Sequence, residues 1–369
     1  MVDSKLLHKD FLIGMGNSME LKLLIIIPTD IHLGVIESQM YGLAILYSKY
    51  YEVTVATPIS VKASIKQGNV KEEKYYGTKG LKTLVKRSDI VYFRDIINFF
   101  KLFLVCKLES KSILYDFRGL AAEESFSRNK NIFKYGILFV AEFLAAILSD
   151  RIQCVSENMK RELRRRYYIK KEINVIPCLT HRCIKRNDER YEKVRFVYVG
   201  GLSKWQKIDL IISVCERIQV EIDCMFTFIT NKPQELKDRL KESQVFNWKV
   251  LTGNNDFVQE ILKNQDFGFL LRDNYLFNKL SSPIKFLEYV SNGVIPIITP
   301  FVGDYSNIVA GKDLGILYIN DSQKLIDEIK HIVNEIESYR NKLFEFSYQR
   351  TWENFHINNY EIDSSLKLK

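Results

Sequence analysis

The segment 267–299, FGFLLRDNYLFNKLSSPIKFLEYVSNGVIPIIT, contains one complete strand–helix–strand unit. Two short apolar runs, Phe267–Leu271 and Ile295–Thr299, have the length and composition of strands that are buried on both faces. Between them, Pro283–Ser291 predicts a helix, because proline is favoured in the first turn and Gly293 suits its end. A strand, a helix and a second strand in this order are typical of a parallel sheet covered by helices.

The same alternation of strands and helices extends in both directions along the chain. Further strands are expected at 21–30, 51–58, 89–93, 112–117, 151–155, 172–177, 194–199, 224–229 and 248–251. Helices are expected at 41–49, 131–149, 209–219, 233–242 and 256–263, in a basic segment that follows the strand 151–155, and over about the last 30 residues. Open sheets of this kind bind ligands outside the carboxyl ends of their strands.

A polar stretch at 181–192 (HRCIKRNDERYE) lacks periodicity and predicts a linker between two halves. The sequence therefore predicts an α/β fold with two doubly wound, Rossmann-like domains that face a cleft, and with helices at its C-terminal end. The expected divisions are a tail at 1–20, an N-terminal domain at 21–182, a C-terminal domain at 193–345 and a C-terminal helix at 346–369 that packs back on the N-terminal domain.

Composition narrows the class of protein. The 369 residues are 46% hydrophobic and 27% charged, which is typical of a globular chain and long enough for two domains. No apolar run reaches the roughly 20 residues that span a bilayer, and the N-terminus does not resemble a signal peptide. The six cysteines form no CxxC pair, so we expect no structural metal, a reducing cytoplasmic environment and no metal cofactor.

Positive charge is concentrated in the first half of the chain. Residues 1–185 carry 30 Lys and Arg against 19 Asp and Glu, whereas residues 186–369 carry 24 against 26. The densest basic cluster lies at 160–171. A basic half fits nucleic acid, an anionic membrane surface or a phosphate-bearing substrate, but an ordinary solvated helix face has the same pattern. Because no aromatic–basic module of known type is present, nucleic acid is not expected as a partner.

The first candidate ligand loop is FVYVGGLSKWQKID at 196–209. A strand leads into Gly200 and Gly201, then into a loop with Lys204 and Lys207, then into a helix. Glycines allow a ligand to approach the backbone closely, and lysines add positive charge for a diphosphate. A tight turn with two exposed lysines would have the same sequence.

The second candidate lies in the segment quoted at the outset. Arg272 follows a strand, Ser282 and Pro283 precede a helix, and Lys285 lies three residues before Glu288 on one face of that helix. Such a helix start, with a lysine nearby, suits a phosphate, and the carboxylate suits two ribose hydroxyls. A capped helix with a local Lys–Glu pair is the structural alternative.

Taken together, these two loops, in this order and about 80 residues apart, resemble the family-4-type retaining glycosyltransferases of GT-B fold. The resemblance implies a nucleotide-sugar donor bound by the C-terminal half. It assigns Glu288 to the nucleotide ribose, Ser282, Pro283 and Ile284 to the donor diphosphate, and Arg272 and Lys285 to charge stabilisation. It also implies donor contacts from Gly200, Gly201, Lys204, Lys207, Thr252, Gly253 and Asn254.

On the acceptor side, the resemblance implies a loop around Asp116, Arg118 and Glu124, and a glycine loop at Gly34. Arg118 stands where the family usually has a histidine, and it is expected to act with Arg272 and Lys285 in catalysis. Leu280 stands where the family has the first glutamate of its E-x7-E motif, and at two donor-loop positions the usual arginine and lysine are replaced by Gly201 and Gln206. These departures fit a branch that uses other cations, and they also fit a non-catalytic protein of the same fold.

The resemblance also implies a reaction and its partners. We expect retaining glycosyl transfer without a metal, from a nucleotide sugar to a glycan acceptor linked to a lipid diphosphate, in surface polysaccharide synthesis. The apolar segments at 99–105 and 132–148 have basic neighbours, which suits an anionic membrane surface and a peripheral position on its inner face. Both segments would look the same as ordinary core. Two other functions compatible with the fold are a non-catalytic partner or glycan-binding subunit and a nucleotide-sugar epimerase.

Overall fold

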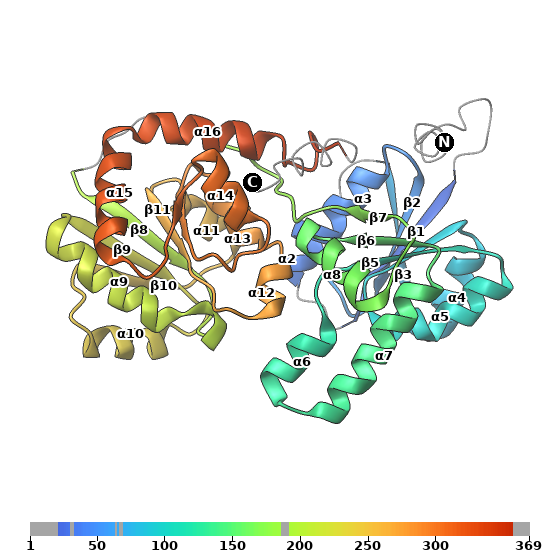
Figure 1. Cartoon of the computed structure of the whole chain (residues 1–369). Coiled ribbons are helices and arrows are strands. Elements are labelled where there is room, and N and C mark those ends of the chain that lie inside the picture. The colour runs from blue at the N-terminus through green and yellow to red at the C-terminus, as the bar shows by residue number, and fades with distance from the viewer. Residues whose placement is uncertain (1–20, 30–32, 63–64, 66–68, 186–191, 357–369) are drawn as a thin grey trace, which may run out of the picture.

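The computed structural model describes residues 21–29, 33–62, 65, 69–185 and 192–356, and its two halves each contain one parallel β-sheet (Figure 1). The sheet of the first half consists of β1 (Lys22–Ile26), β2 (Glu52–Pro58), β3 (Val70–Tyr75), β4 (Ile90–Phe93), β5 (Ser112–Phe117), β6 (Arg151–Cys154) and β7 (Ile173–Val175). The sheet of the second half consists of β8 (Val194–Val199), β9 (Cys224–Ile229), β10 (Trp248–Leu251), β11 (Phe267–Leu270), β12 (Ile295–Ile298) and β13 (Ile316–Leu317).

Helices cover both sheets. In the first half they are α2 (Leu33–Val35), a π-helical turn (Ile36–Met40), α3 (Tyr41–Tyr47), α4 (Gly77–Lys86), α5 (Ile96–Leu108), α6 (Ala121–Asn129), α7 (Ile132–Leu148) and α8 (Glu157–Tyr167). In the second half they are a 3₁₀ turn (Lys204–Gln206), α9 (Ile208–Glu221), α10 (Pro233–Glu242), α11 (Asn255–Leu262), α12 (Leu276–Leu280), α13 (Ile284–Val290), α14 (Tyr305–Lys312), α15 (Ser322–Asn334) and α16 (Ile336–Tyr348).

The strand order confirms two doubly wound sheets. The orders are β3-β2-β1-β4-β5-β6-β7 and β10-β9-β8-β11-β12-β13, and neighbouring strands pair in parallel. In each sheet the order reverses beside the first strand, between β1 and β4 in one half and between β8 and β11 in the other. Ligands of such sheets bind at this switch point, outside the carboxyl ends of the strands.

Two strands were not expected from the sequence, and both lie at a sheet edge. β3 has the sequence VKEEKY and is mostly partly exposed, so it lacks the apolar run that marks the buried strands. β13 is only two residues long. Edge strands that are short or charged resist pairing with other chains, and the same properties hide them from a search for hydrophobic periodicity.

The C-terminal part of the chain returns to the first half, but not as the helix expected at 346–369. α16 ends at Tyr348, and the chain continues as turns. Thr351 then pairs with Thr180, and Trp352 and Phe355 are buried in the core of the first half. Residues 357–369 and the tail expected at 1–20 lie outside the described residues, and the division into domains remains a proposal.

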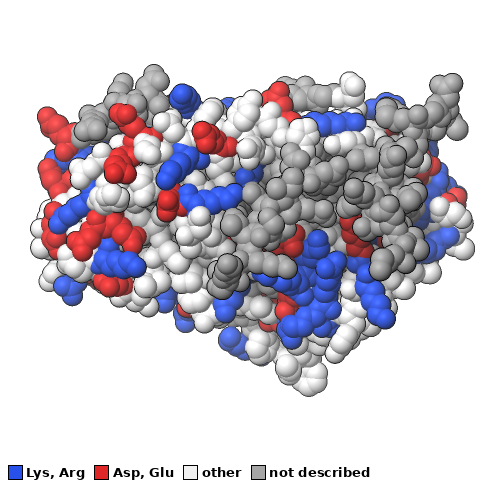
Figure 2. Space-filling view, turned by 45° about the horizontal axis from the view of Figure 1, so that its top comes forward, with Lys and Arg blue, Asp and Glu red and all other residues white. Residues whose placement is uncertain are grey.

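The surface shows the charge asymmetry of the sequence (Figure 2). Lys and Arg side chains gather on the half with the seven-stranded sheet, near the middle of the molecule, whereas both signs mix on the other half. Part of the basic cluster at 160–171 is structural: Arg165 and Arg166 pair with Glu162, and the Lys171 ammonium donates to backbone carbonyls near the end of α7.

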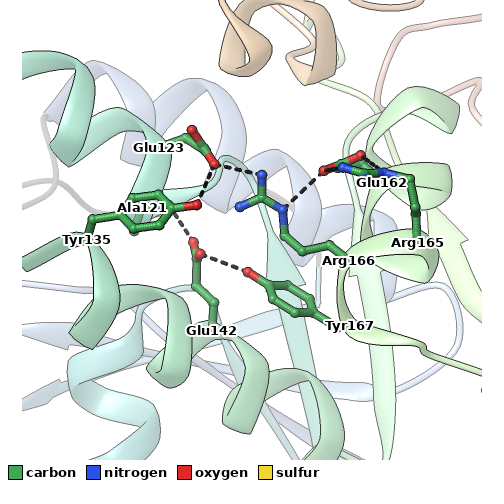
Figure 3. A network of polar contacts seen from close by, with 8 residues as sticks. All are labelled: Ala121, Glu123, Tyr135, Glu142, Glu162, Arg165, Arg166 and Tyr167. Atoms are coloured by element: carbon green, nitrogen blue, oxygen red, sulfur yellow. Dashed lines mark hydrogen bonds and ion pairs between the residues drawn. The ribbon is translucent and has the colours of Figure 1, made fainter. Parts of the chain in front are cut away.

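A polar network ties the protruding α6–α7 hairpin to α8 (Figure 3). The carboxylate of Glu142 on α7 accepts hydrogen bonds from the Ala121 amide and, at 3.0 Å, from the Tyr167 hydroxyl. Arg166 on α8 donates to Glu123 on α6 at 2.6 Å. Glu142 is fully buried, and burial raises its pKa to about 7 against the opposing effect of these hydrogen bonds. Three helices are thus joined through one ionisable carboxyl group.

Candidate functional site

Apart from the loop at 252–254, the expected donor residues gather at the switch point of the six-stranded sheet. Gly200 and Gly201 follow β8, Arg272 follows β11 after one residue, and Lys285 and Glu288 lie on α13, which connects β11 with β12. The topology therefore brings the two sequence loops, about 80 residues apart, together at the carboxyl ends of the neighbouring strands β8 and β11.

Three ionisable groups at this edge have no partner within the part of the chain that the structure describes. Arg272, Lys285 and Glu288 are partly buried, and none of their side chains forms an ion pair or a hydrogen bond there. Burial lowers the pKa of Arg272, and it lowers the pKa of Lys285 to about 8, with Glu288 opposing this shift and Arg272 adding to it. Burial also raises the pKa of Glu288. Charges withdrawn from water without a partner are costly, so this cluster is suited to a ligand that supplies complementary groups.

In the glycine turn beside this cluster, Gly200 has no space for a side chain. A Cβ atom on Gly200 would lie 2.4 Å from the Gln206 amide oxygen and 2.6 Å from the Tyr198 hydroxyl. That hydroxyl donates to the same Gln206 oxygen at 2.8 Å, so Gln206, at the position where the related motif has a lysine, shapes the turn. The Gly200 amide is used within the sheet, where it donates to the Ile229 carbonyl.

The two loop lysines differ in their surroundings. Lys204 is exposed, and its side chain forms no ion pair or hydrogen bond with described residues. Lys207 adopts a left-handed backbone conformation, and its ammonium lies 3.8 Å from the Asp273 carboxylate. Lys204 can therefore turn toward an anionic ligand freely, whereas Lys207 would have to break its ion pair with Asp273.

The tripeptide expected to face the diphosphate is used partly for contact between the halves. The Ser282 hydroxyl accepts a hydrogen bond from the Cys178 amide at 3.1 Å and lies 3.1 Å from the Tyr305 hydroxyl. Pro283 precedes α13, whose first residue is Ile284, and that helix is only seven residues long. A short helix has a weak dipole, so charge at this site comes mainly from Arg272 and Lys285.

The loop expected to meet the nucleobase is exposed at the opposite edge of the sheet from β13. Thr252, Gly253 and Asn254 follow β10, which is separated from β8 by β9. The Asn254 side chain caps α11 by accepting from the Phe257 amide at 3.0 Å, and a Cβ atom on Gly253 would meet the Phe257 ring at 2.3 Å. Local structure alone therefore explains the asparagine and the glycine.

On the acceptor side, Asp116 and Arg118 form a buried ion pair at the end of β5. Arg118 Nε donates to Asp116 at 2.5 Å and its Nη1 to the Ile176 carbonyl at 3.2 Å. Burial alone would lower the pKa of Arg118, but the Asp116 carboxylate raises it. Because Asp116 is fully buried and also accepts from Tyr92, it positions Arg118 and does not face the cleft itself.

The remaining acceptor-side residues are less directly placed. Glu124 on α6 is partly buried, which raises its pKa, and it pairs with Arg128. Gly34 lies in the short helix α2, where its carbonyl accepts from Ser38. Residues 30–32, which precede α2, lie outside the described residues.

Sequence reasoning missed Arg94, which directly follows β4 at the switch point of the seven-stranded sheet. Its guanidinium is partly buried, and Nη1 lies 3.2 Å from the Met40 sulfur. The available signal was a repeated pattern, because an Arg–Asp pair follows the fourth strand in each half, at 94–95 and at 272–273.

Leu280, which replaces the first motif glutamate, belongs to the hydrophobic core of the first half. It is 4% exposed, and its carbonyl accepts a hydrogen bond from the Ser156 hydroxyl at 2.7 Å. Next to it, the Asp304 carboxylate accepts from the Glu157 and Asn158 amides at 2.7 and 3.0 Å. Position 280 thus holds the halves together, and its side chain is not available to a sugar.

A cavity of about 310 Å³ also lies between the halves, beside α8 and α12. Its lining includes Arg161, Lys279 and Gly303, but none of the residues expected at the active site. In the described ranges we find no group of three or more His, Cys, Asp and Glu side chains arranged to hold a metal ion.

Comparison with known proteins identifies the fold. No protein-family model matches the chain, and no curated protein is significantly similar to it. Anabaena HepE, solved in complex with UDP-glucose, is 12% identical, with a TM-score of 0.68 over 94% of this chain and 100% of that one. Sucrose-phosphate synthase from Thermosynechococcus elongatus is 12% identical, with a TM-score of 0.70 over 94% of this chain and 99% of that one. WaaG, a glycosyltransferase involved in lipopolysaccharide biosynthesis, is 11% identical, with a TM-score of 0.63 over 94% of this chain and 100% of that one. The expected GT-B fold is confirmed.

Proposed function

We propose, from the GT-B fold and the unpartnered charges at its switch point, that this protein is a glycosyltransferase with a nucleotide-sugar donor. The observation that carries the proposal is the cluster of Arg272, Lys285 and Glu288, which are partly buried beside a glycine turn and lack partners in the described chain. Two cations suit a diphosphate, and a carboxylate three residues after Lys285 on the same helix suits the hydroxyls of a ribose.

In this proposal the chemistry is the departure of a nucleoside diphosphate from the anomeric carbon. Negative charge grows on the leaving oxygen, and Arg272 and Lys285 stabilise it electrostatically. Lys204 and the glycine turn contribute to the donor site, and Arg118 faces it from the other half. The resemblance to family-4-type enzymes supports retention of configuration and a reaction without a metal, and HepE with UDP-glucose supports a UDP-sugar as the first donor to test.

The proposed acceptor is a glycan on a lipid diphosphate, presented at an anionic membrane surface. Ten large apolar side chains on the neighbouring helices α5 and α7 are exposed, among them Phe133 at 84%, Ile137 at 71% and Leu104 at 69%. Exposed lysines accompany them, including Lys101 and Lys134. An apolar helix face with basic neighbours suits anionic lipids and fits a cytoplasmic enzyme that is peripheral to the inner face of the membrane. No described helix has the length and hydropathy of a membrane span.

The experiment that tests this function is a transfer assay. Purified protein is incubated with a panel of nucleotide sugars, with and without a bacterial lipid extract, and the release of nucleoside diphosphate is measured. We expect release with one donor, dependent on the extract, and at least about 100-fold slower release with Lys285→Ala, because a charge that stabilises the transition state is removed.

The matched control is Lys249→Ala, since Lys249 is an exposed lysine on β10 in the same half. Equal rates for wild type and Lys285→Ala would contradict the proposed site. Binding of a nucleotide sugar without transfer to any extract would instead favour a non-catalytic protein, for which Leu280 in place of the motif glutamate is the supporting observation.

A further inference from the structure

Arg94 in the first half occupies the position that Arg272 occupies in the second half. Each arginine follows the fourth strand of its sheet, at the point where the strand order reverses, and each precedes an aspartate. Each is partly buried, and for each burial lowers the pKa of the guanidinium. Neither arginine forms an ion pair with a described residue. The two halves thus place matching cations at matching crevices.

The surroundings of Arg94 carry an excess of positive charge. The carboxylate of Asp116, which acts on the Arg94 charge, is already engaged by Arg118 and by the Tyr92 hydroxyl. Arg118 further lowers the pKa of Arg94 by charge repulsion. Among the described residues, the Arg94 guanidinium forms one hydrogen bond, to the sulfur of Met40, which is a weak acceptor. A buried guanidinium with so little compensation is unfavourable unless an anion joins it.

Arg94 and Arg118 lie close to the proposed donor site across the cleft. Arg118 donates to the carbonyl of Ile176, and Cys178, two residues further, donates its amide to the Ser282 hydroxyl at 3.1 Å. Ser282 precedes Lys285 by three residues. An anion held between Arg94 and Arg118 would therefore be a neighbour of the donor diphosphate, where an acceptor must lie for transfer.

We propose that Arg94, beside Arg118, binds a phosphate or diphosphate group of the acceptor. The planar guanidinium forms paired hydrogen bonds with phosphate oxygens, and an anion between two arginines also relieves their repulsion. That the anion belongs to an acceptor rests on the proposed function, but the anion site itself can be tested separately. A purely structural Arg94, packed on Met40, is the competing explanation.

The test measures binding of inorganic pyrophosphate by calorimetry in an Arg272→Gln background, which weakens the donor-side anion site. Adding Arg94→Gln should weaken pyrophosphate binding by about tenfold or more, the effect of losing hydrogen bonds to a charged group. Adding Arg94→Lys, which keeps the charge, should weaken binding less. The control is Arg164→Gln in the same background, because Arg164 is exposed on α8 and forms no ion pair with described residues. Circular dichroism checks that each variant is folded.

Unchanged pyrophosphate affinity in folded Arg94→Gln, Arg272→Gln protein would overturn the inference. An equal loss in the Arg164→Gln control would also overturn it, since net charge alone would then explain the result. If no nucleotide binds wild type but pyrophosphate binding depends on Arg94, the donor proposal fails and the anion site stands. Farnesyl diphosphate in detergent separates the sources: binding that depends on Arg94 supports a lipid-linked acceptor, whereas dependence with pyrophosphate alone supports a free phosphate ligand.

Discussion

Lys285 lies partly buried beside Arg272 and Glu288 at the carboxyl end of the six-stranded sheet, and burial lowers its pKa to about 8. The ammonium is thus mostly charged at pH 7 and mostly neutral at pH 9. A bound diphosphate would favour the charged form and raise this pKa. At the scale of single residues, the proposed donor site therefore has a proton-linked cation at its centre.

The resulting prediction concerns the pH dependence of nucleotide binding. The affinity for a nucleoside diphosphate should fall as pH rises above about 8, because the free protein then loses the charge that the ligand needs. Lys285→Arg should keep its affinity to higher pH, since arginine stays protonated. Calorimetric titrations between pH 6.5 and 9.5 measure the effect, and an identical decline in both proteins would place its cause elsewhere.

Glu142 is the ionisable group that joins three elements, α6, α7 and α8. Its pKa in the folded protein is raised to about 7, so the folded state binds more protons than the unfolded state between about pH 4.5 and 7. The contribution of this group to stability is therefore fully present below the unfolded pKa and is lost as pH rises through the folded pKa. The charged and titratable groups near it include Arg166, Tyr167 and Tyr115.

At the scale of elements, this carboxyl group makes the hairpin sensitive to pH. Relative to Glu142→Gln, wild-type protein should lose about 2 kcal/mol of unfolding free energy between pH 5.5 and 8, because only the wild type must ionise a buried group. Urea denaturation at both pH values measures this. Glu172→Gln, which changes an exposed carboxylate in the same half, is the control. A difference between wild type and Glu142→Gln that stays constant with pH would show that Glu142 remains ionised throughout.

The exposed face of α5 and α7 gives a prediction about membrane binding. Phe133→Ser with Ile137→Ser should weaken binding to vesicles containing phosphatidylglycerol by about tenfold or more, because two insertable side chains are lost. The control changes two exposed apolar residues of the other half, Val220→Ser with Phe246→Ser. Sedimentation with vesicles measures binding. If both pairs of substitutions have the same effect, this face is not the membrane contact.

At the scale of the whole molecule, one carboxylate connects the halves. Asp304 in the second half accepts from two amides at the start of α8 in the first. Asp304→Ala should weaken the contact between the halves by about 1–2 kcal/mol and increase the radius of gyration seen by small-angle X-ray scattering. Asp321→Ala, which removes a helix cap within the second half, should not. Scattering that is unchanged in Asp304→Ala would assign the closed arrangement to other contacts, such as Leu280.

The fold could be predicted well from the sequence because its buried strands are continuous apolar runs. β5, β8, β9 and β10 were placed to the residue, and the other expected strands to within a few residues, since buried parallel strands are continuous in hydrophobicity. β3 and the returning turns at 349–356 were missed. Their residues are polar or irregular, and only contact with distant segments, as between Thr351 and Thr180, gives them structure.

The candidate site was less predictable than the fold, because motifs show which residues are near a site but not which of their atoms are already engaged. Arg272, Lys285 and Glu288 were expected there, and the structure brings them together. The motif could not show that Ser282, Asn254 and Asp116 have partners in the folded chain. Arg94 was missed because the role proposed for it depends on strand order, which the repeated Arg–Asp pair at 94–95 and 272–273 does not reveal by itself.

The central claim is tested most directly by a thermal-shift screen of nucleoside diphosphates and nucleotide sugars. We predict that one nucleobase raises the melting temperature of wild type and of Glu242→Ala, an exposed control on α10, but not of Glu288→Ala. That result would place the ribose at Glu288 and identify the base of the donor. Stabilisation by no nucleotide, or equal stabilisation of Glu288→Ala, would contradict donor binding at this site.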